Sequence, residues 1–149
     1  MTRINVLPTH LLLDQHLMAE YRELPMVAAA LRRSLNAKKF PSIPENYTLN
    51  AGHVKFFYNK VNYLRKRYSD LVEDLRFRGY NVDPDSREAN WNVFDKLPVE
   101  EFTPTIEDMK INADRILLRY EDKPAWYKWY GREVENYREI LSEFIRINN

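Results

Sequence analysis

The chain has 149 residues, a formal net charge of +1, 44% hydrophobic residues, only three glycines and no cysteine. A chain of this length is expected to form one domain whose core is large enough to fold without cross-links. The lack of cysteine excludes disulfides, thiolate zinc sites and thiol nucleophiles. The few glycines exclude the glycine-rich phosphate loops of Walker A and Rossmann type.

Other common sites are excluded by motif. The three histidines, His10, His16 and His53, are too scattered for an HExxH metal helix, and there is no GxSxG elbow. The longest apolar run, residues 26–31, is far shorter than the ~20 residues of a membrane helix, and no signal-peptide pattern opens the chain. We therefore expect no metal, no nucleotide cofactor and no membrane partner, and a monomer that works in the cytoplasm.

The first predicted helix runs from about residue 14 to residue 34. His16, Glu20 and Glu23 fall at positions i, i+4 and i+7, so they share one face. A neighbouring apolar stripe is formed by Leu17, Tyr21, Leu24 and Val27. Pro25 lies inside this pattern and should kink the helix near Tyr21, because it removes a backbone donor.

A loop is predicted over residues 36–51, which hold two prolines and several turn formers. A second helix is predicted over about 60–78, with Gly79 as the left-handed residue just past its end. Its buried face is expected to comprise Val61, Leu64, Tyr68, Leu71, Val72 and Leu75.

Residues 80–104 read as an irregular acidic connection. A third helix should begin with Thr105 as N-cap and Asp108 at the capping-box position, and end before Pro124. A last amphipathic helix is predicted over about 132–147. With no strand pattern in the chain, we expect an all-α fold: a compact single-domain bundle of three main helices plus a C-terminal helical extension.

Charge is distributed unevenly although the net charge is small. Residues 32–67 contain nine lysines and arginines but one acid, Glu45. This asymmetry fits a surface that binds a polyanion such as DNA, although a solvated surface of mixed charge is an equal alternative.

Thr2 is a candidate nucleophile through its backbone. Removal of the start Met would expose its α-amine, whose usual pKa of about 7.7–8.0 leaves roughly a tenth of it neutral at pH 7. A neutral amine forms imines without the need for a desolvated lysine. The alternatives are that Thr2 has no role, or that its hydroxyl is the nucleophile.

Several charged and aromatic side chains are further candidates. Glu23 could serve as a general acid/base or be an ordinary surface carboxylate. Arg115 and Arg119 project together at i, i+4 and could grip phosphates or pair with nearby acids. The aromatic stretch 126–130 could form part of the core, or its rings and the lysine between them could stack on nucleic-acid bases.

Four strings carry a family resemblance: TRIN at 2–5, DQHLMAEYRELP at 14–25, GHVKFFY at 52–58 and WYKWYG at 126–131. Together they resemble the pyrimidine-dimer DNA glycosylase/AP lyases of the phage endonuclease V type. The resemblance spans about residues 1–131, the expected glycosylase-like domain, and residues 132–149 are an extension of the same domain.

The resemblance implies a function and a set of site residues. The Thr2 α-amine would attack C1′ of the damaged nucleotide, and Glu23 would assist sugar opening and β-elimination. The partner would be damaged double-stranded DNA, so the protein would associate with the nucleoid, and the N-terminus would thread among the helices. The residues that would contact DNA are Arg3, Gln15, His16, Arg22, Arg115, Arg119 and Lys128.

One position departs from the family pattern: Met26 stands where the phage enzyme has an arginine. Without this cation, either phosphate binding is weaker or the missing charge is supplied by Arg32 or Arg33. Two alternative functions stay open, an enzyme acting mainly on abasic sites or other lesions, and a helical DNA-binding module without catalysis.

Overall fold

The computed structural model describes residues 3–39, 42–83 and 85–149. Within these residues the chain is all-helical, as predicted, and contains no β-strand beyond one isolated bridge between Trp129 and Arg132. The helices, in chain order, are η1 (Thr9–Leu11), α1 (Asp14–Glu23), α2 (Met26–Asn36), α3 (His53–Phe56), η2 (Phe57–Asn59), α4 (Val61–Phe77), η3 (Asp85–Lys96), α5 (Ile106–Asp122) and α6 (Tyr137–Ile147).

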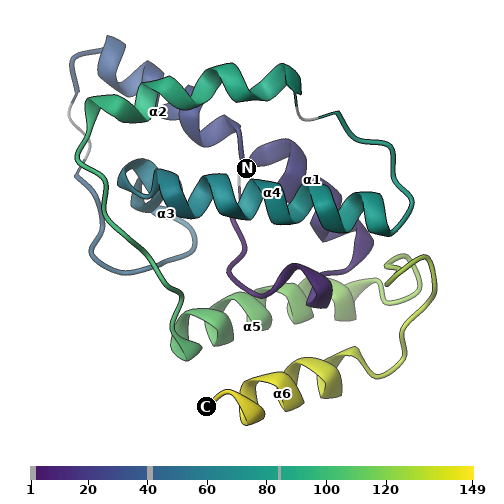
Figure 1. Ribbon diagram of the computed structural model, residues 1–149. Coiled ribbons are helices and arrows are strands. Elements are labelled where there is room, and N and C mark those ends of the chain that lie inside the picture. Colours follow the sequence, from purple (N-terminus) through teal and green to yellow (C-terminus); the bar gives the residue numbers. More distant parts are fainter. Residues whose placement is uncertain (1–2, 40–41, 84) are drawn as a thin grey trace.

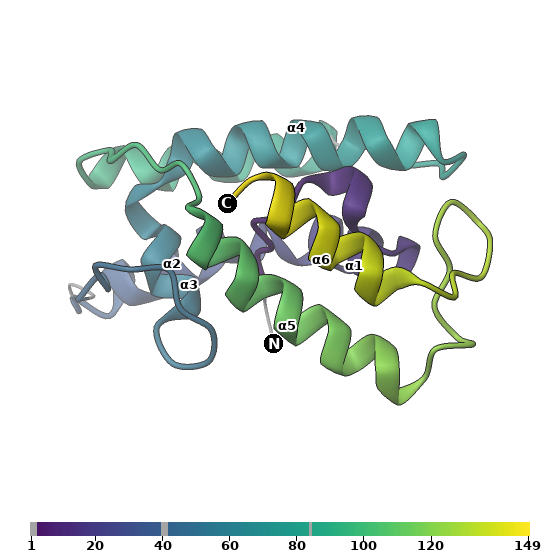
Figure 2. The ribbon, with the colours of Figure 1, turned by 90° about the horizontal axis from the view of Figure 1, so that it is seen from below.

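The helices form a compact bundle around α4 (Figure 1). α1 packs on α4, and α2 packs against η3 on one side of the molecule. α5 and α6 lie side by side and antiparallel on the other side, which is plain when the molecule is seen from below (Figure 2). No helix in the described part of the chain is long and apolar enough to cross a membrane.

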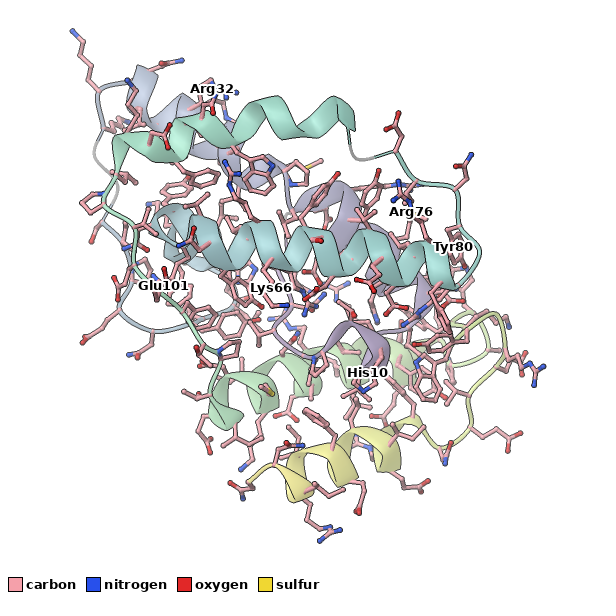
Figure 3. The ribbon with its side chains drawn as sticks, viewed as in Figure 1. His10, Arg32, Lys66, Arg76, Tyr80 and Glu101 are labelled. Carbon is pink, nitrogen blue, oxygen red and sulfur yellow. The ribbon has the colours of Figure 1, made fainter. Side chains whose placement is uncertain are left out.

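The interior is filled by the apolar faces that the sequence predicted. Every residue of the predicted stripe on the first helix, and of the predicted face of α4, is buried. Side chains from α4, α5 and η3 occupy the spaces between the ribbons (Figure 3). The fully buried Tyr137 joins α6 to this core, and its hydroxyl donates to the Leu11 carbonyl at 2.6 Å.

The sequence motifs that predicted the end of α4 and the start of α5 are confirmed. Thr105 caps α5 with Asp108 in a reciprocal capping box, and Gly79 follows α4 with φ of 96°. Pro25 separates α1 from α2, so the single kinked helix predicted over 14–34 is two helices. The last helix starts at Tyr137 rather than near residue 132, because Gly131, at φ 78°, and the Trp129–Arg132 bridge form a turn there.

The N-terminal segment runs through the bundle without regular secondary structure, which confirms its predicted threading among the helices (Figure 1). Ile4, Asn5, Val6 and Leu7 are all buried. Asn112 of α5 and Arg67 of α4 bond to this segment. The segment therefore leads from the core to the surface on which Arg3 is exposed in part.

Candidate active site

A pocket of about 340 Å³ opens where the N-terminal segment, α1, α5 and the loop after α5 meet. The pocket is lined by Arg3, Asn5, Gln15, His16, Ala19, Glu20, Glu23, Ile116, Arg119, Trp126 and Tyr127. Five of the predicted site residues thus come together: Arg3, Gln15, His16, Glu23 and Arg119. They derive from three segments that are far apart in the sequence.

Helix α1 supplies one wall. His16, Glu20 and Glu23 all line the pocket, so the face predicted from their i, i+4, i+7 spacing is real. Glu20 is buried and is held by Arg67, whose Nε and Nη2 donate to its two oxygens at 2.7 and 2.9 Å. Glu23 is partly exposed and forms no hydrogen bond or ion pair with any residue that the structure describes. Of the two carboxylates, Glu23 is the one available for chemistry.

His16 is an unusual side chain in this wall. Both ring nitrogens are buried and find no hydrogen-bond partner among the described residues. Its ring lies 4.8 Å from that of Tyr127, centroid to centroid. Burial, with the charges of Arg119 and Arg3, lowers the pKa of His16 to about 4. The imidazole is therefore neutral at pH 7.

Cations gather at the mouth of the pocket. The pKa of Arg3 is lowered by burial and then by the nearby charges of Arg119 and Arg115. Arg115 donates to the Asn50 side chain at 3.0 Å, and Arg119 is exposed and lines the pocket. No ion pair joins either of the two to Glu121 or Asp122, and Glu121 pairs instead with Arg138. These arginines create a positive field suited to phosphate.

Gln15 and Lys128 have structural partners. The Gln15 amide donates to the Trp126 carbonyl at 2.7 Å, and its oxygen accepts from the Lys128 backbone at 3.0 Å. The ammonium of Lys128 pairs with Glu133 at 3.2 Å. Gln15 thus fastens the aromatic loop onto α1, a role that the sequence did not suggest.

Asp14, which was not predicted as a site residue, fastens the same loop. Its carboxylate accepts from the backbones of Tyr130 and Gly131 at 3.1 and 2.8 Å. Arg78 holds that carboxylate at 2.8 Å. The aromatic stretch 126–130 contributes both to the core and to the surface. Tyr127 is buried, whereas Trp126 is 59% exposed and lines the pocket.

The cations of the basic stretch 32–67 fall into two groups, those that have partners within the fold and those that are exposed. Lys60 and Arg67 are buried, Lys66 pairs with Asp70, and the Arg65 guanidinium lies over the Trp91 ring. The remaining cations are exposed: Arg32, Arg33, Lys38, Lys39 and Lys55. Lys66 on α4 and Arg32 on α2 are far apart in Figure 3, so the stretch is not one continuous patch.

Two of those exposed cations border a second hollow. Arg33 and Lys55 line a pocket of about 560 Å³ together with Met26 and His53. Arg33 and Met26 thus border the same hollow, whereas Arg32 does not line it. Arg22 is exposed and does not line the first pocket.

The remaining predicted residue, Thr2, lies outside the described residues. It precedes Arg3 in the sequence, and Arg3 lines the pocket. The described residues contain no group of three or more potential metal ligands. The pocket therefore contains a neutral imidazole, two arginines and a carboxylate, that of Glu23, with no hydrogen bond or ion pair to a described residue.

The family assignment agrees with this arrangement. A family model described as pyrimidine dimer DNA glycosylase matches residues 1–88, more than half of the chain. The chain belongs to this family. The matched part of the glycosylase includes the N-terminal segment and all of α1, hence Arg3, His16 and Glu23. Arg119, Trp126 and Tyr127, which complete the pocket, come from outside the matched residues.

Proposed function

We propose that this glycosylase removes the base at cyclobutane pyrimidine dimers through an imine formed by the Thr2 α-amine, and then cuts the strand by β-elimination. The observation that carries this proposal is that Arg3 and Glu23 line one pocket. This supports the proposal because Thr2 precedes Arg3 in the sequence, and Glu23 forms no hydrogen bond or ion pair with a described residue. Imine chemistry requires those two groups.

The proposed reaction starts at C1′ of the damaged nucleotide. The amine nitrogen bonds to C1′ as the glycosidic bond breaks, and the base leaves with that electron pair and takes up a proton. The sugar ring then opens: the C1′–O4′ bond breaks, O4′ gains a proton, and the nitrogen–carbon bond becomes an imine. Glu23 assists the opening as a general acid/base.

The second stage cuts the strand. Glu23 accepts a proton from C2′, and the electrons left behind form the C2′–C3′ double bond. The 3′ phosphate leaves with the electrons of its bond to C3′. Water then hydrolyses the imine and releases the α-amine for another turnover.

The arginines hold the DNA backbone in this proposal. Arg3 and Arg119 bind phosphates next to the lesion, while Arg22 and Arg115 bind phosphates further along the strand. Guanidinium groups suit this role because they contact phosphate with two parallel hydrogen bonds. Lys128 can exchange Glu133 for a phosphate, since an exposed ion pair is worth only about 0–1 kcal/mol.

Gln15 and His16 would act on the strand at the pocket itself. The neutral ring of His16 would pack against a base or sugar at the pocket, and Gln15 would donate its second amide hydrogen to the same strand. Double-stranded DNA containing the lesion is the proposed partner, and the protein is proposed to act as a monomer.

Incision of plasmid DNA tests this function. Ultraviolet-irradiated and abasic plasmids are incubated with protein whose N-terminus is free at Thr2, or verified as acetylated. The free protein should nick both substrates, and the acetylated protein should nick neither above background. Full nicking by the blocked protein would overturn the proposal, and nicking of abasic plasmid alone would favour the alternative of an abasic-site lyase.

A further inference from the structure

The N-terminal segment poses a problem of hydrogen bonding. Residues 4–7 are buried inside a helical bundle but belong to no helix or strand, so their backbone groups have no regular partners. A buried backbone group without a partner costs as much as a lost hydrogen bond. The segment can therefore cross the core only if side chains supply hydrogen-bond partners.

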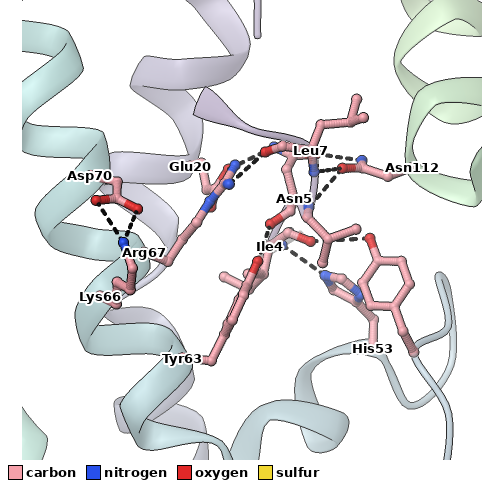
Figure 4. A network of polar contacts seen from close by, with 12 residues as sticks. Ile4, Asn5, Leu7, Glu20, His53, Tyr63, Lys66, Arg67, Asp70 and Asn112 are labelled. Atoms are coloured by element: carbon pink, nitrogen blue, oxygen red, sulfur yellow. Dashed lines mark hydrogen bonds and ion pairs between the residues drawn. The ribbon is translucent and has the colours of Figure 1, made fainter. Parts of the chain in front are cut away.

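Side chains from four parts of the fold do so: α3, α4, α5 and the loop that carries Tyr47 (Figure 4). Asn112 accepts from the Val6 and Leu7 amides at 2.7 and 3.0 Å. Arg67 donates to the Leu7 carbonyl at 2.5 Å, and Tyr63 donates to the Asn5 carbonyl at 3.0 Å. The Asn5 side chain is itself held by Glu20 and Asn112. Two further side chains bond the backbone of Ile4.

Ile4 is held on both sides of its backbone. Its amide donates to Nε2 of His53 at 2.8 Å, and its carbonyl accepts from the Tyr47 hydroxyl at 3.2 Å. Nδ1 of His53 lies 2.8 Å from the Thr48 carbonyl, so the hydrogen of the ring is on Nδ1 and the lone pair is on Nε2. Both ring nitrogens are thus used, and the tautomer is determined by its two partners.

The surroundings of His53 also fix its ring. Tyr47 and Phe57 pack edge-on against it at centroid distances of 5.7 and 5.6 Å. Gly52 precedes it at φ of 87°, a left-handed conformation that starts α3 at this residue. A Cβ on Gly52 would lie 3.0 Å from a Pro44 side-chain atom. The GHVKFFY string has no role in the proposed reaction itself. It holds His53 rigidly as the hydrogen-bond acceptor for the Ile4 amide.

We propose that His53, together with Tyr47, is a positioning residue that places the α-amine of Thr2 against the lesion. This inference rests on the proposed function. His53 binds the peptide group that joins Arg3 to Ile4, two residues from the nucleophile and next to a residue of the pocket. A shift of about 1 Å in a reacting group can lower a rate roughly 100-fold, so this bond should control the chemical step rather than DNA binding.

Four variants test the inference. His53→Leu removes the acceptor, while His53→Gln restores one with Oε1 near the position of Nε2. Tyr47→Phe removes the bond to the Ile4 carbonyl. Tyr137→Phe is the matched control, because it removes a buried tyrosine hydrogen bond to a carbonyl, that of Leu11, remote from Ile4.

Each variant is compared by the single-turnover rate of borohydride-trapped crosslink at saturating protein, by affinity for undamaged duplex and by thermal unfolding. We expect His53→Leu to lower the trapping rate roughly 10- to 100-fold with unchanged affinity, and His53→Gln to recover most of the rate. Tyr47→Phe should trap more slowly than Tyr137→Phe even where both unfold at similar temperatures.

Trapping by His53→Leu at the wild-type rate would overturn the inference. If His53→Leu does not fold, equal rates for Tyr47→Phe and Tyr137→Phe would overturn it instead. The wild-type protein separates this outcome from failure of the proposed function. If wild type forms no crosslink at all, the imine mechanism is wrong, whereas a normal wild-type crosslink with unaffected variants refutes only the role of His53.

Discussion

Glu20 and Glu23 lie one helical turn apart on α1 and line the same pocket, but among the described residues only Glu20 has an ion-pair partner. The carboxylate of Glu20 is buried and bonded to Arg67 and Asn5, whereas that of Glu23 is partly exposed and has no hydrogen bond to a described residue. A carboxylate saturated by partners cannot readily exchange a proton with a substrate. The pairing therefore separates a structural acid from a candidate catalytic one.

Substitution of the two acids should have opposite consequences. Glu23→Gln keeps the shape of the side chain but cannot exchange a proton, so strand scission should fall by about 10²–10⁴-fold with unchanged thermal stability. Glu20→Gln should lower the unfolding temperature and retain scission at temperatures where it is folded. Single-turnover cleavage of irradiated duplex and thermal unfolding measure both effects. Wild-type scission by Glu23→Gln would show that Glu23 is only a surface carboxylate.

The ion pair between Glu20 and Arg67 should be costly to break from one side. Arg67→Met leaves a buried carboxylate without its cation, and we expect the free energy of unfolding to fall by about 3–5 kcal/mol. The double variant Glu20→Gln/Arg67→Met should lose less than the sum of the two single variants, since neither charge is then left alone. Urea unfolding gives all three values, and strict additivity would contradict the coupling.

His16 should make stability depend on pH. Its pKa is lowered to about 4 by burial and by the charges of Arg119 and Arg3, from a usual value of 6.5. Between these values the unfolded chain binds a proton that the folded protein does not, so stability falls as the pH is lowered through this range. The loss amounts to about 3 kcal/mol at most.

Two measurements check this behaviour. The difference in unfolding free energy between wild type and His16→Phe should change mainly between pH 6.5 and pH 4. By NMR titration, Arg119→Ala should raise the pKa of His16 but leave it below the usual value, because burial is the larger cause. An ordinary pKa for His16 in the wild-type protein would contradict the buried environment described here.

Salt dependence of DNA binding should distinguish the arginines at the pocket from the other cations. If about four to six phosphates are neutralised, log K should fall against log salt with a slope of roughly −4 to −5. Arg115→Ala and Arg119→Ala should each reduce that slope by about one, on damaged and undamaged duplex alike. Lys66→Ala is the control, because Lys66 pairs with Asp70 on α4 away from the pocket. A normal slope with a lost chemical step would place the two arginines in catalysis instead.

Local patterns in the sequence predicted much of the fold. The capping box of Thr105 and Asp108 and the left-handed Gly79 are decided by neighbours within a few residues, and both were confirmed. α3 and η3 were missed. α3 is only four residues long, and residues 85–96 lack a helical apolar period although Trp91 and Phe94 are buried. Such segments owe their form to tertiary packing, which local propensity does not contain.

The candidate site was predictable to a different extent. The shared face of His16, Glu20 and Glu23 followed from helical spacing, and the family resemblance supplied Arg3 and Arg119. Sequence spacing did not predict the ion pair between Glu20 and Arg67, which are 47 residues apart, or the hydrogen bond between the Ile4 amide and His53. These contacts depend on how α1, α3 and α4 pack around the N-terminal segment.

The identity of the nucleophile is tested most directly by mapping the trapped adduct. Wild-type protein is mixed with duplex DNA containing a pyrimidine dimer, reduced with borohydride and digested, and the crosslinked peptide is sequenced by mass spectrometry. The expected result is a single adduct on the α-amine of Thr2, with Met1 absent. An adduct on Lys128 or another lysine, or strand scission without any trapped adduct, would contradict the imine mechanism at the N-terminus.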